Sequence, residues 1–205
     1  MTRAVLLAHG SPDPRSAVAV RAAADAVAAR TGTEVTSAYL DHDEPRLADA
    51  VRDDEVVVLP LLLSTAYHAK VDVPAAVAPL GGRVRLLEPL GHPGAVLDAR
   101  LRRAEAPVVV VSAGTRDDAE RAAFADAVAA SAWRTGVRAV AAYATGPGPR
   151  VADVAAPGEA SVVPWLLAPG RLLDAVVASA DGLEVVGGPL LDEPLLLDEV
   201  AERLA

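Results

Sequence analysis

The sequence contains no cysteine, one lysine and few aromatic residues. Only 3% of its 205 residues are Phe, Trp or Tyr. The lack of thiols excludes disulfides, thiolate zinc sites and iron–sulfur clusters, so any metal must be bound by imidazole and carboxylate. No apolar run approaches the ~18 residues that a membrane span needs, and the N-terminal segment is too short for a secretory signal peptide. We therefore expect a cytoplasmic protein that does not bind membranes.

Charge and hydropathy limit the partners further. The formal net charge is −9 and the sequence pI is about 4.9. Nucleic acid is bound by clustered Lys and Arg, and the sequence has no such cluster, so nucleic acid is excluded as a partner. Hydrophobic residues make up 52% of the chain, enough to fill the core of one large domain or two small ones.

Short runs rich in Val and Leu alternate with Ala-rich amphipathic stretches, a pattern typical of a parallel sheet covered by helices. Strands are predicted at 4–8, 34–40, 55–63, 84–87, 107–111, 137–143, 160–167 and 183–186. Helices are predicted at 14–30, 45–51, 73–80, 93–103, 118–134, 149–155, 171–180 and 193–204. The sequence therefore predicts an α/β fold.

The two halves of the chain resemble each other at an offset of 104 residues, which becomes 100 after a short deletion. Identical pairs at these offsets include Gly10 and Gly114, Thr31 and Thr135, Pro60 and Pro164, and Asp98 and Asp198. Such a repeat predicts two duplicated domains of four parallel strands each, flavodoxin-like or Rossmann-like, over residues 1–104 and 105–205.

Residues that can bind a metal follow three predicted strands of the first half. His9 follows the first strand, Asp41 the second and His68 the third. Because the carboxyl ends of parallel strands meet at one edge of a sheet, these side chains can converge there. Two imidazoles and one carboxylate suit Zn²⁺, Fe²⁺, Co²⁺ or Ni²⁺ and leave coordination positions open.

The repeat provides an internal control for these three residues. The matching positions of the second half hold Ala113, Thr145 and Leu172. The apolar frame is kept in both halves, whereas the candidate ligands occur in one. This difference favours a role in chemistry over a role in folding, so we predict a metal site in residues 1–104 and none in 105–205.

Several polar residues also have a structural interpretation. Asp41 lies in an Asp-His-Asp-Glu-Pro stretch that is equally typical of a turn. Asp13 and Asp72 each lie just before a helix start that contains proline, and we predict that both are helix N-caps. His42 and His92 lie in turn-like surroundings, and we predict that both are solvated loop residues.

Three segments of the first half resemble motifs of a known enzyme family. They are Ala8-His9-Gly10-Ser11, Tyr39-Leu40-Asp41 followed by Glu44-Pro45, and His68-Ala69-Lys70-Val71-Asp72-Val73-Pro74. They are similar to the His-Gly-Ser, Phe-Leu-Glu and His-x-x-x-Asp-Ile-Pro segments of the sirohydrochlorin chelatases, class II cobalt and iron chelatases of the CbiX and SirB type. The internal repeat resembles the two-half form of that family, whose duplicated domains face each other across a cleft.

The resemblance implies a reaction, which is ATP-independent insertion of a divalent metal into a tetrapyrrole with release of two protons. It implies that His9 and His68 are catalytic, metal-binding histidines and that Asp41 is the carboxylate between them, where the family more usually has Glu. The expected substrates are Fe²⁺, Co²⁺ or Ni²⁺ and a tetrapyrrole of sirohaem or cobalamin biosynthesis, with no organic cofactor. Two joined halves are expected to complete the cleft, so the chain can act as a monomer.

A polycarboxylate tetrapyrrole needs cationic and polar partners near the strand ends. The candidate substrate-binding residues are Ser11, Arg15, Arg46, Tyr67, Lys70 and Arg171. A locally positive cleft inside an acidic shell would account for the cations, and solvated surface positions are the alternative. Trp165 is a candidate wall for the macrocycle, with core packing as its alternative.

Single features of the sequence bear on other possible functions. A metal or tetrapyrrole carrier without turnover would have much the same sequence and is the alternative to a chelatase. A histidine phosphatase needs an arginine just before its histidine, and Ala8 stands there. A dinucleotide-binding domain is unsupported because the segment after the first strand lacks the required glycine spacing.

Overall fold

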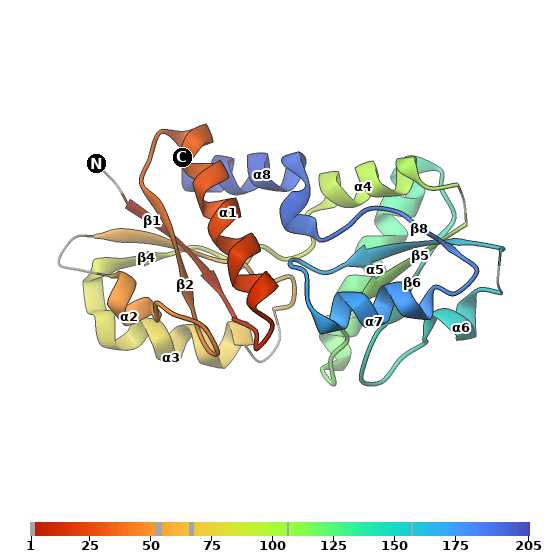
Figure 1. Cartoon of the computed structure of the whole chain (residues 1–205), viewed down its shortest axis with the longest axis horizontal. Coiled ribbons are helices and arrows are strands. Elements are labelled where there is room, and N and C mark those ends of the chain that lie inside the picture. Colours follow the sequence, from red (N-terminus) through yellow and green to blue (C-terminus); the bar gives the residue numbers. More distant parts are fainter. Residues whose placement is uncertain (1–2, 52–54, 66–67, 106, 157) are drawn as a thin grey trace. The chain divides into compact units, whose positions relative to one another are not determined.

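The computed structural model describes residues 3–51, 55–65, 68–105, 107–156 and 158–205. Within these ranges it contains two four-stranded sheets, and the strand pairs in both are parallel (Figure 1). The strand orders are β2-β1-β3-β4 and β6-β5-β7-β8. The predicted α/β fold with two parallel sheets is confirmed.

The first sheet consists of β1 (Arg3–Ala8), β2 (Val35–Tyr39), β3 (Val56–Pro60) and β4 (Val84–Leu86). The segments between its strands include α1 (Pro14–Thr31), α2 (Leu47–Ala50), a π-helical turn η1 (His68–Asp72), α3 (Val73–Val77) and a 3-10 segment η2 (Ala78–Arg83).

The second sheet consists of β5 (Val108–Ser112), β6 (Ala139–Tyr143), β7 (Ser161–Trp165) and β8 (Glu184–Val185). The remaining helices are α4 (Gly94–Arg103), α5 (Asp118–Thr135), α6 (Val151–Val154), α7 (Arg171–Ser179), the 3-10 turn η3 (Leu190–Asp192) and α8 (Pro194–Leu204). The pairs Ala4–Val35 and Val108–Ala139 show that equivalent strands of the two sheets share one register, as the offset of 104 predicts.

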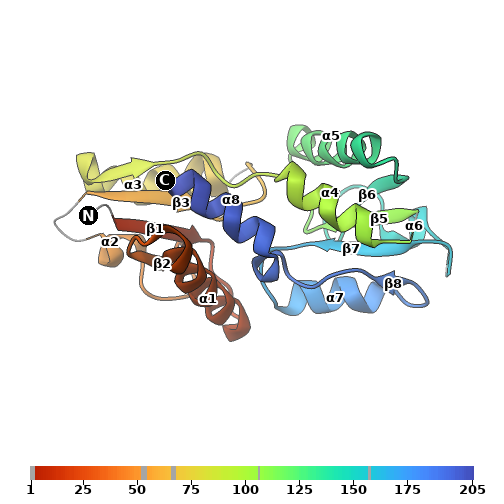
Figure 2. The same cartoon turned by 90° about the horizontal axis from the view of Figure 1, so that it is seen from above.

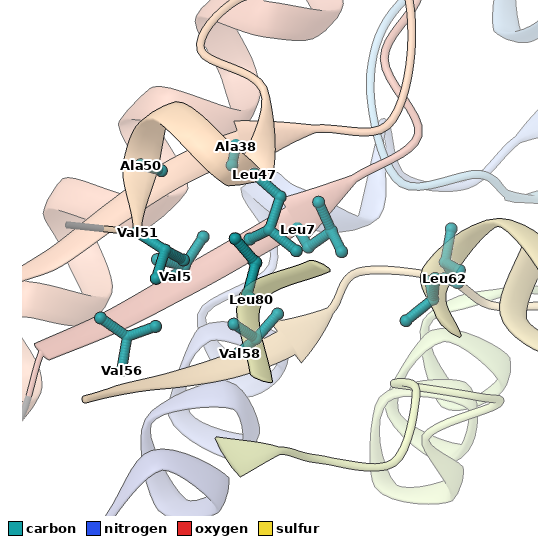
Figure 3. Close-up of a cluster of buried hydrophobic side chains, with 11 residues drawn as sticks. Val5, Leu7, Ala38, Leu47, Ala50, Val51, Val56, Val58, Leu62 and Leu80 are labelled. Atoms are coloured by element: carbon teal, nitrogen blue, oxygen red, sulfur yellow. The ribbon is translucent and has the colours of Figure 1, made fainter. Parts of the chain in front are cut away.

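Each sheet has its own core, built by the Val and Leu runs of its strands. In the first sheet, buried side chains of β1 and β3 pack against α2 and η2 (Figure 3). The members of this core include Val5, Leu7, Val56, Val58, Leu47, Ala50, Val51 and Leu80. Because a central parallel strand is covered on both faces, its sequence is almost continuously apolar. The second sheet has an equivalent core, which includes Val109, Val111, Val162, Leu173 and Val176.

The compact units differ from the two sequence halves. One unit comprises residues 1–91 and 191–205, and the other comprises 92–190. The difference arises because the last helix of each half packs with the other half's first helix: α8 lies against α1, and α4 lies against α5 (Figure 2). The repeat halves 1–104 and 105–205 therefore exchange one helix each.

Two equivalent ion pairs hold the exchanged helices. In the first unit, Arg30 Nε lies 2.8 Å from Asp198 Oδ1 of α8. In the second unit, Arg134 donates to Asp98 Oδ1 of α4 at 2.7 Å, and Ser131 also donates to this carboxylate. Arg30 matches Arg134 in the repeat and Asp98 matches Asp198, so both halves keep the same docking pair.

The first helix of each sequence half, α1 or α5, has matching ends. Asp13 accepts from the backbone N–H of Arg15 at the start of α1, as predicted for an N-cap, and Asp117 caps α5 in the same way. Both helices end at a glycine with positive φ, 65° at Gly32 and 72° at Gly136. No described helix is both long enough and apolar enough to cross a membrane.

A close backbone approach explains why Gly10 and Gly114 are present in both halves. Gly10 has φ +94°, and a Cβ there would lie 1.8 Å from the carbonyl oxygen of Asp41. Gly114 has φ +97°, and a Cβ there would lie 2.0 Å from the carbonyl oxygen of Thr145. Any side chain would push the first strand's loop away from the second strand's end, so both positions require glycine.

Candidate metal and catalytic site

The predicted site residues of the first half gather at the carboxyl edge of the first sheet. His9 directly follows β1, Asp41 lies two residues after β2, and His68 begins η1, which follows β3. The backbone N–H of Asp41 donates to the carbonyl of His9 at 2.7 Å, so the first two segments are held side by side. The parallel topology therefore places all three residues as the sequence predicts.

Three imidazoles lie close together at this edge. The ring centroids of His9 and His68 are 4.1 Å apart, with an angle of 35° between the ring planes. The ring of His42 lies 6.0 Å from that of His9, edge on at 87°. We predicted His42 to be a solvated loop residue. Its side chain is indeed 42% exposed, but the prediction missed its contact with the ring of His9. The contact could have been predicted from the sequence, because His42 directly follows Asp41, which was already placed at this edge.

His42 also has an unusual backbone. Its φ is +63°, and among the residues that the structure describes no other non-glycine residue has a positive φ. A left-handed conformation is uncommon for residues with a Cβ and is often found where function requires a particular side-chain direction. The carboxylate of Asp41 stabilises it, since Asp41 Oδ1 accepts from the backbone N–H of His42 at 2.8 Å.

The surroundings of His9 favour its neutral form. Burial lowers the pKa of His9, and the neighbouring His68 and His42 lower it further because a second positive charge beside them is unfavourable. Its Nδ1 atom is buried and has no hydrogen-bond partner among the described residues. A neutral imidazole with an unpartnered nitrogen can accept a proton or bind a metal ion.

His68 has a carboxylate partner. Its Nδ1 lies 2.5 Å from Asp72 Oδ2, four residues further along the same helical segment. The prediction that the Asp72 side chain caps a helix is wrong, because it makes no capping hydrogen bond. The physical reason is that η1 runs directly into α3, so the backbone of Asp72 is already helical, with φ −73° and ψ −40°, whereas a cap needs an extended backbone.

Asp41 is more exposed than the histidines and has partners of its own. Its Oδ1 lies 3.4 Å from Arg46 Nη1, and its Oδ2 lies 3.6 Å from His42 Nε2. The backbone N–H of His42 is the main cause that lowers the pKa of Asp41, with Arg46 contributing. Within the part of the chain that the structure describes, no three His, Asp or Glu side chains form a ready-made metal site. Ligation by His9, His68 and Asp41 together stays a prediction.

The candidate substrate-binding residues of the first half are tied to neighbouring groups. Arg15 donates to both carboxylate oxygens of Asp13, at 3.0 and 2.7 Å. Arg46 donates to the carbonyl oxygen of Leu40 at 2.7 Å. The backbone N–H of Ser11 donates to Asp43 Oδ2 at 2.9 Å. These contacts order the loops that follow β1 and β2.

The remaining candidate substrate-binding residues differ in their exposure to solvent. Lys70 is an exposed residue of η1, and Arg171 is an exposed residue at the start of α7 in the second unit. Tyr67 lies outside the described residues. Trp165 is fully buried, so core packing, and not a wall for a bound macrocycle, is its role.

The second sheet carries a different cluster at its carboxyl edge. Trp165 Nε1 donates to His92 Nδ1 at 3.1 Å, and His92 Nε2 lies 3.4 Å from Glu120 Oε1. The side chains of His92 and Glu120 are only 11% and 6% exposed. The prediction of His92 as a solvated loop residue is therefore wrong, because the indole and carboxylate that cover it come from distant β7 and α5.

Comparisons with known proteins identify relatives of this architecture. Residues 3–106 match the family model described as CbiX, which confirms the resemblance inferred from the sequence motifs. A solved structure of CbiX, described as the terminal enzyme for biosynthesis of siroheme in denitrifying bacteria, is 21% identical, and the match covers 99% of this chain and 97% of that chain with a TM-score of 0.73. The two proteins share a fold over almost their whole lengths.

A second solved structure is a CbiX protein from Marinobacter aquaeolei VT8, provisionally assigned to cobalamin (vitamin B12) biosynthesis. It is 29% identical, and the match covers 50% of this chain and 92% of that chain with a TM-score of 0.41. No curated protein sequence matches this chain.

Proposed function

Because this chain belongs to the CbiX family, we propose that it is a chelatase that inserts a divalent metal ion into a tetrapyrrole. The proposed substrates are sirohydrochlorin and Fe²⁺ or Co²⁺, in sirohaem or cobalamin biosynthesis. The similar structure from denitrifying bacteria is that of a terminal enzyme of siroheme biosynthesis, which makes Fe²⁺ the first metal to test. In this proposal the enzyme is a lyase that uses no ATP and no organic cofactor.

The pair His9 and His68 is the observation that carries the proposal. Their rings lie 4.1 Å apart at the end of β1 and the start of η1. A chelatase must bind its metal substrate and then release it, so a few imidazole ligands with open coordination positions suit it better than a closed four-ligand site. The absence of thiols in the sequence also favours release, because thiolates bind these metals tightly.

The same pair can take the protons that the reaction liberates. Metal insertion replaces two pyrrole N–H protons, and each needs a base that is unprotonated at physiological pH. The lowered pKa of His9 keeps its imidazole unprotonated there. Two imidazoles this close do not both hold a proton readily, since the charges repel, so we expect each proton to pass to solvent before the next is accepted. His68, which is 49% exposed, gives that route to water.

The polar residues around the histidines have supporting roles in this proposal. Asp41 holds His42 through its backbone N–H, and we propose that it orients an imidazole or completes the metal site. Cations at the strand ends, the half-buried Arg46 and the exposed Lys70 among them, are proposed to meet the carboxylates of the tetrapyrrole. Charge-assisted contacts of this kind orient a substrate even on a protein with net charge −9.

A metal-by-substrate matrix tests the proposal. Purified protein is offered Fe²⁺, Co²⁺ or Ni²⁺ together with sirohydrochlorin or protoporphyrin, and the metallated product is followed by its absorbance against protein-free controls. We expect insertion into sirohydrochlorin with many product molecules formed per chain, and little or none into protoporphyrin. Product that never exceeds one molecule per chain would favour a carrier, and no insertion with any pair would refute a chelatase.

A further inference from the structure

The carboxylate of Asp72 has a contact that helix capping does not explain. Its Oδ2 lies 2.5 Å from His68 Nδ1, closer than an ordinary N–H···O hydrogen bond. Asp72 stands at the N-cap position of α3, yet its side chain accepts no hydrogen bond from that helix. The side chain therefore serves the histidine and not the helix.

The π-helical turn η1 makes this contact possible. His68 and Asp72 are the first and last residues of η1, and side chains four positions apart on a helix are neighbours. A π-helical turn is rare and frequently occurs at a functional site. Here it brings a carboxylate against one nitrogen of the imidazole that lies beside His9.

The internal repeat separates Asp72 from the ordinary caps of this protein. The cap Asp13 has a matching cap, Asp117, in the second half. At the offset that relates the halves, His68 and Asp72 correspond to Leu172 and Val176. The imidazole and its carboxylate are thus absent together, whereas the cap is kept, which is the pattern of a functional pair.

We propose that Asp72 is a positioning residue that fixes the tautomer and ring orientation of His68. An ionised carboxylate can only accept a hydrogen bond, so Nδ1 of His68 carries the hydrogen and Nε2 carries the lone pair. A carboxylate that accepts from one ring nitrogen of a metal-binding histidine fixes the tautomer and the ring orientation, and its loss weakens metal binding. Nε2 is then the atom of His68 that receives the metal or the pyrrole proton, and this last step rests on the proposed chelatase function.

The test measures the tautomer directly. The metal-free full-length protein is labelled with ¹⁵N in its histidines, and the ring nitrogens of His68 are read by long-range ¹H–¹⁵N correlation at a pH where the ring is neutral. A neutral histidine in water favours hydrogen on Nε2, so a dominant Nδ1–H form is the signature expected from Asp72. Co²⁺ affinity of the same samples provides a second readout that does not depend on turnover.

Asp72→Ser is the informative variant because serine is a good helix cap but brings no carboxylate to His68. We expect the Nδ1–H form of His68 to lose its dominance and Co²⁺ affinity to fall by roughly 10- to 100-fold. If the serine variant does not fold, Asp72→Asn replaces it in the test, because asparagine has the same size as aspartate. The asparagine variant should shift the tautomer of His68 in the same direction. Asp117→Ser replaces a true cap and should change neither readout.

The outcomes separate this proposal from the proposed function. If His68 keeps its Nδ1–H form and its Co²⁺ affinity in the serine and asparagine variants, the positioning role is wrong while the chelatase stands. If the wild type inserts no metal but the tautomer shifts as expected, the chelatase fails while Asp72 still orients His68. A wild-type His68 with hydrogen mainly on Nε2 overturns the positioning role without any variant.

Discussion

The carboxyl edges of the two sheets both carry histidine, in opposite surroundings. At the edge of the first sheet, His9, His42 and His68 lie near one another, and the buried Nδ1 of His9 has no hydrogen-bond partner among the described residues. At the edge of the second sheet, His92 is buried between the indole of Trp165 and the carboxylate of Glu120.

The difference separates an edge suited to bind a ligand from an edge whose histidine is packed. Burial lowers the pKa of His9 and of His92 alike, so a shifted pKa alone does not tell the two apart. Their partners do. Nδ1 of His92 accepts from Trp165, and its Nε2, which makes no hydrogen bond, lies 3.4 Å from the Glu120 carboxylate, whereas the buried Nδ1 of His9 has no hydrogen-bond partner among the described residues. The first histidine is suited to a ligand, and the second stabilises the core.

The largest expected effect is the loss of metal insertion when the first edge is changed. His9→Ala or His68→Ala removes an imidazole that, in the proposed reaction, binds the metal or accepts a proton, so we expect turnover to fall by about 10²- to 10⁴-fold. The free energy of unfolding should change little, because neither side chain holds the core. Turnover is measured with the best metal and tetrapyrrole pair, and stability by urea unfolding.

The control for this prediction is Trp133→Ala in α5. Trp133 is 86% exposed, so its loss should affect neither turnover nor stability. The proposed difference between the two edges is refuted if His9→Ala keeps wild-type turnover. It is also refuted if His9→Ala lowers the free energy of unfolding as much as a core substitution does.

A smaller and opposite effect is expected at the second edge. His92→Leu leaves the buried N–H of Trp165 without its acceptor, which costs about 1–3 kcal/mol of the free energy of unfolding. His92→Asn places a carbonyl oxygen near the position of Nδ1 and should recover part of that loss. Urea unfolding followed by Trp fluorescence gives both values.

In the folded His92→Asn variant the chemistry at the first edge is unchanged, so its turnover should stay close to wild type. A large loss of turnover with normal stability would show that His92 takes part in the reaction, and the contrast between the two edges would not hold.

The smallest expected effect is a pH dependence of stability at the second edge. Burial, partly opposed by Glu120, lowers the pKa of His92 from its ordinary value of 6.5. The unfolded chain therefore takes up the proton first as the pH falls. Stability is fully present above about pH 6.5 and declines as the pH falls toward the pKa of the folded state.

The measurement is urea unfolding of the wild type and of His92→Asn at a series of pH values between about 8 and 5. The variant lacks the titrating group, so its stability should fall less with acid. Equal slopes for the two proteins would mean that another group, such as His9, accounts for the acid sensitivity.

Much of the fold follows from local patterns. The eight predicted strands and the main helices are found at the expected places, because alternation of apolar runs, prolines at helix starts and glycines at helix ends are read within a few residues. The repeat also predicted two domains of four parallel strands each, and the structure contains two such sheets. The convergence of His9, Asp41 and His68 on one edge followed from parallel topology.

Other features escaped prediction because they depend on contacts between distant segments. The exchange of α4 and α8 is one, since an amphipathic helix encodes an apolar face but not which helix will cover it. The burial of His92 under β7 and α5 is another. The π-helical turn η1, which turns Asp72 from a predicted cap into a partner of His68, left no periodic signal over its five residues.

The sequence by itself determined an α/β chain with two repeats, a metal chemistry limited to imidazole and carboxylate, and a set of candidate ligands confined to the first half. The tertiary structure decided which of the four histidines meet. His42 joins His9 and His68, while His92 is buried, because each outcome depends on side chains that strand order brings together from far apart in the chain. Residue type and local spacing carry the first kind of information, and only three-dimensional packing carries the second.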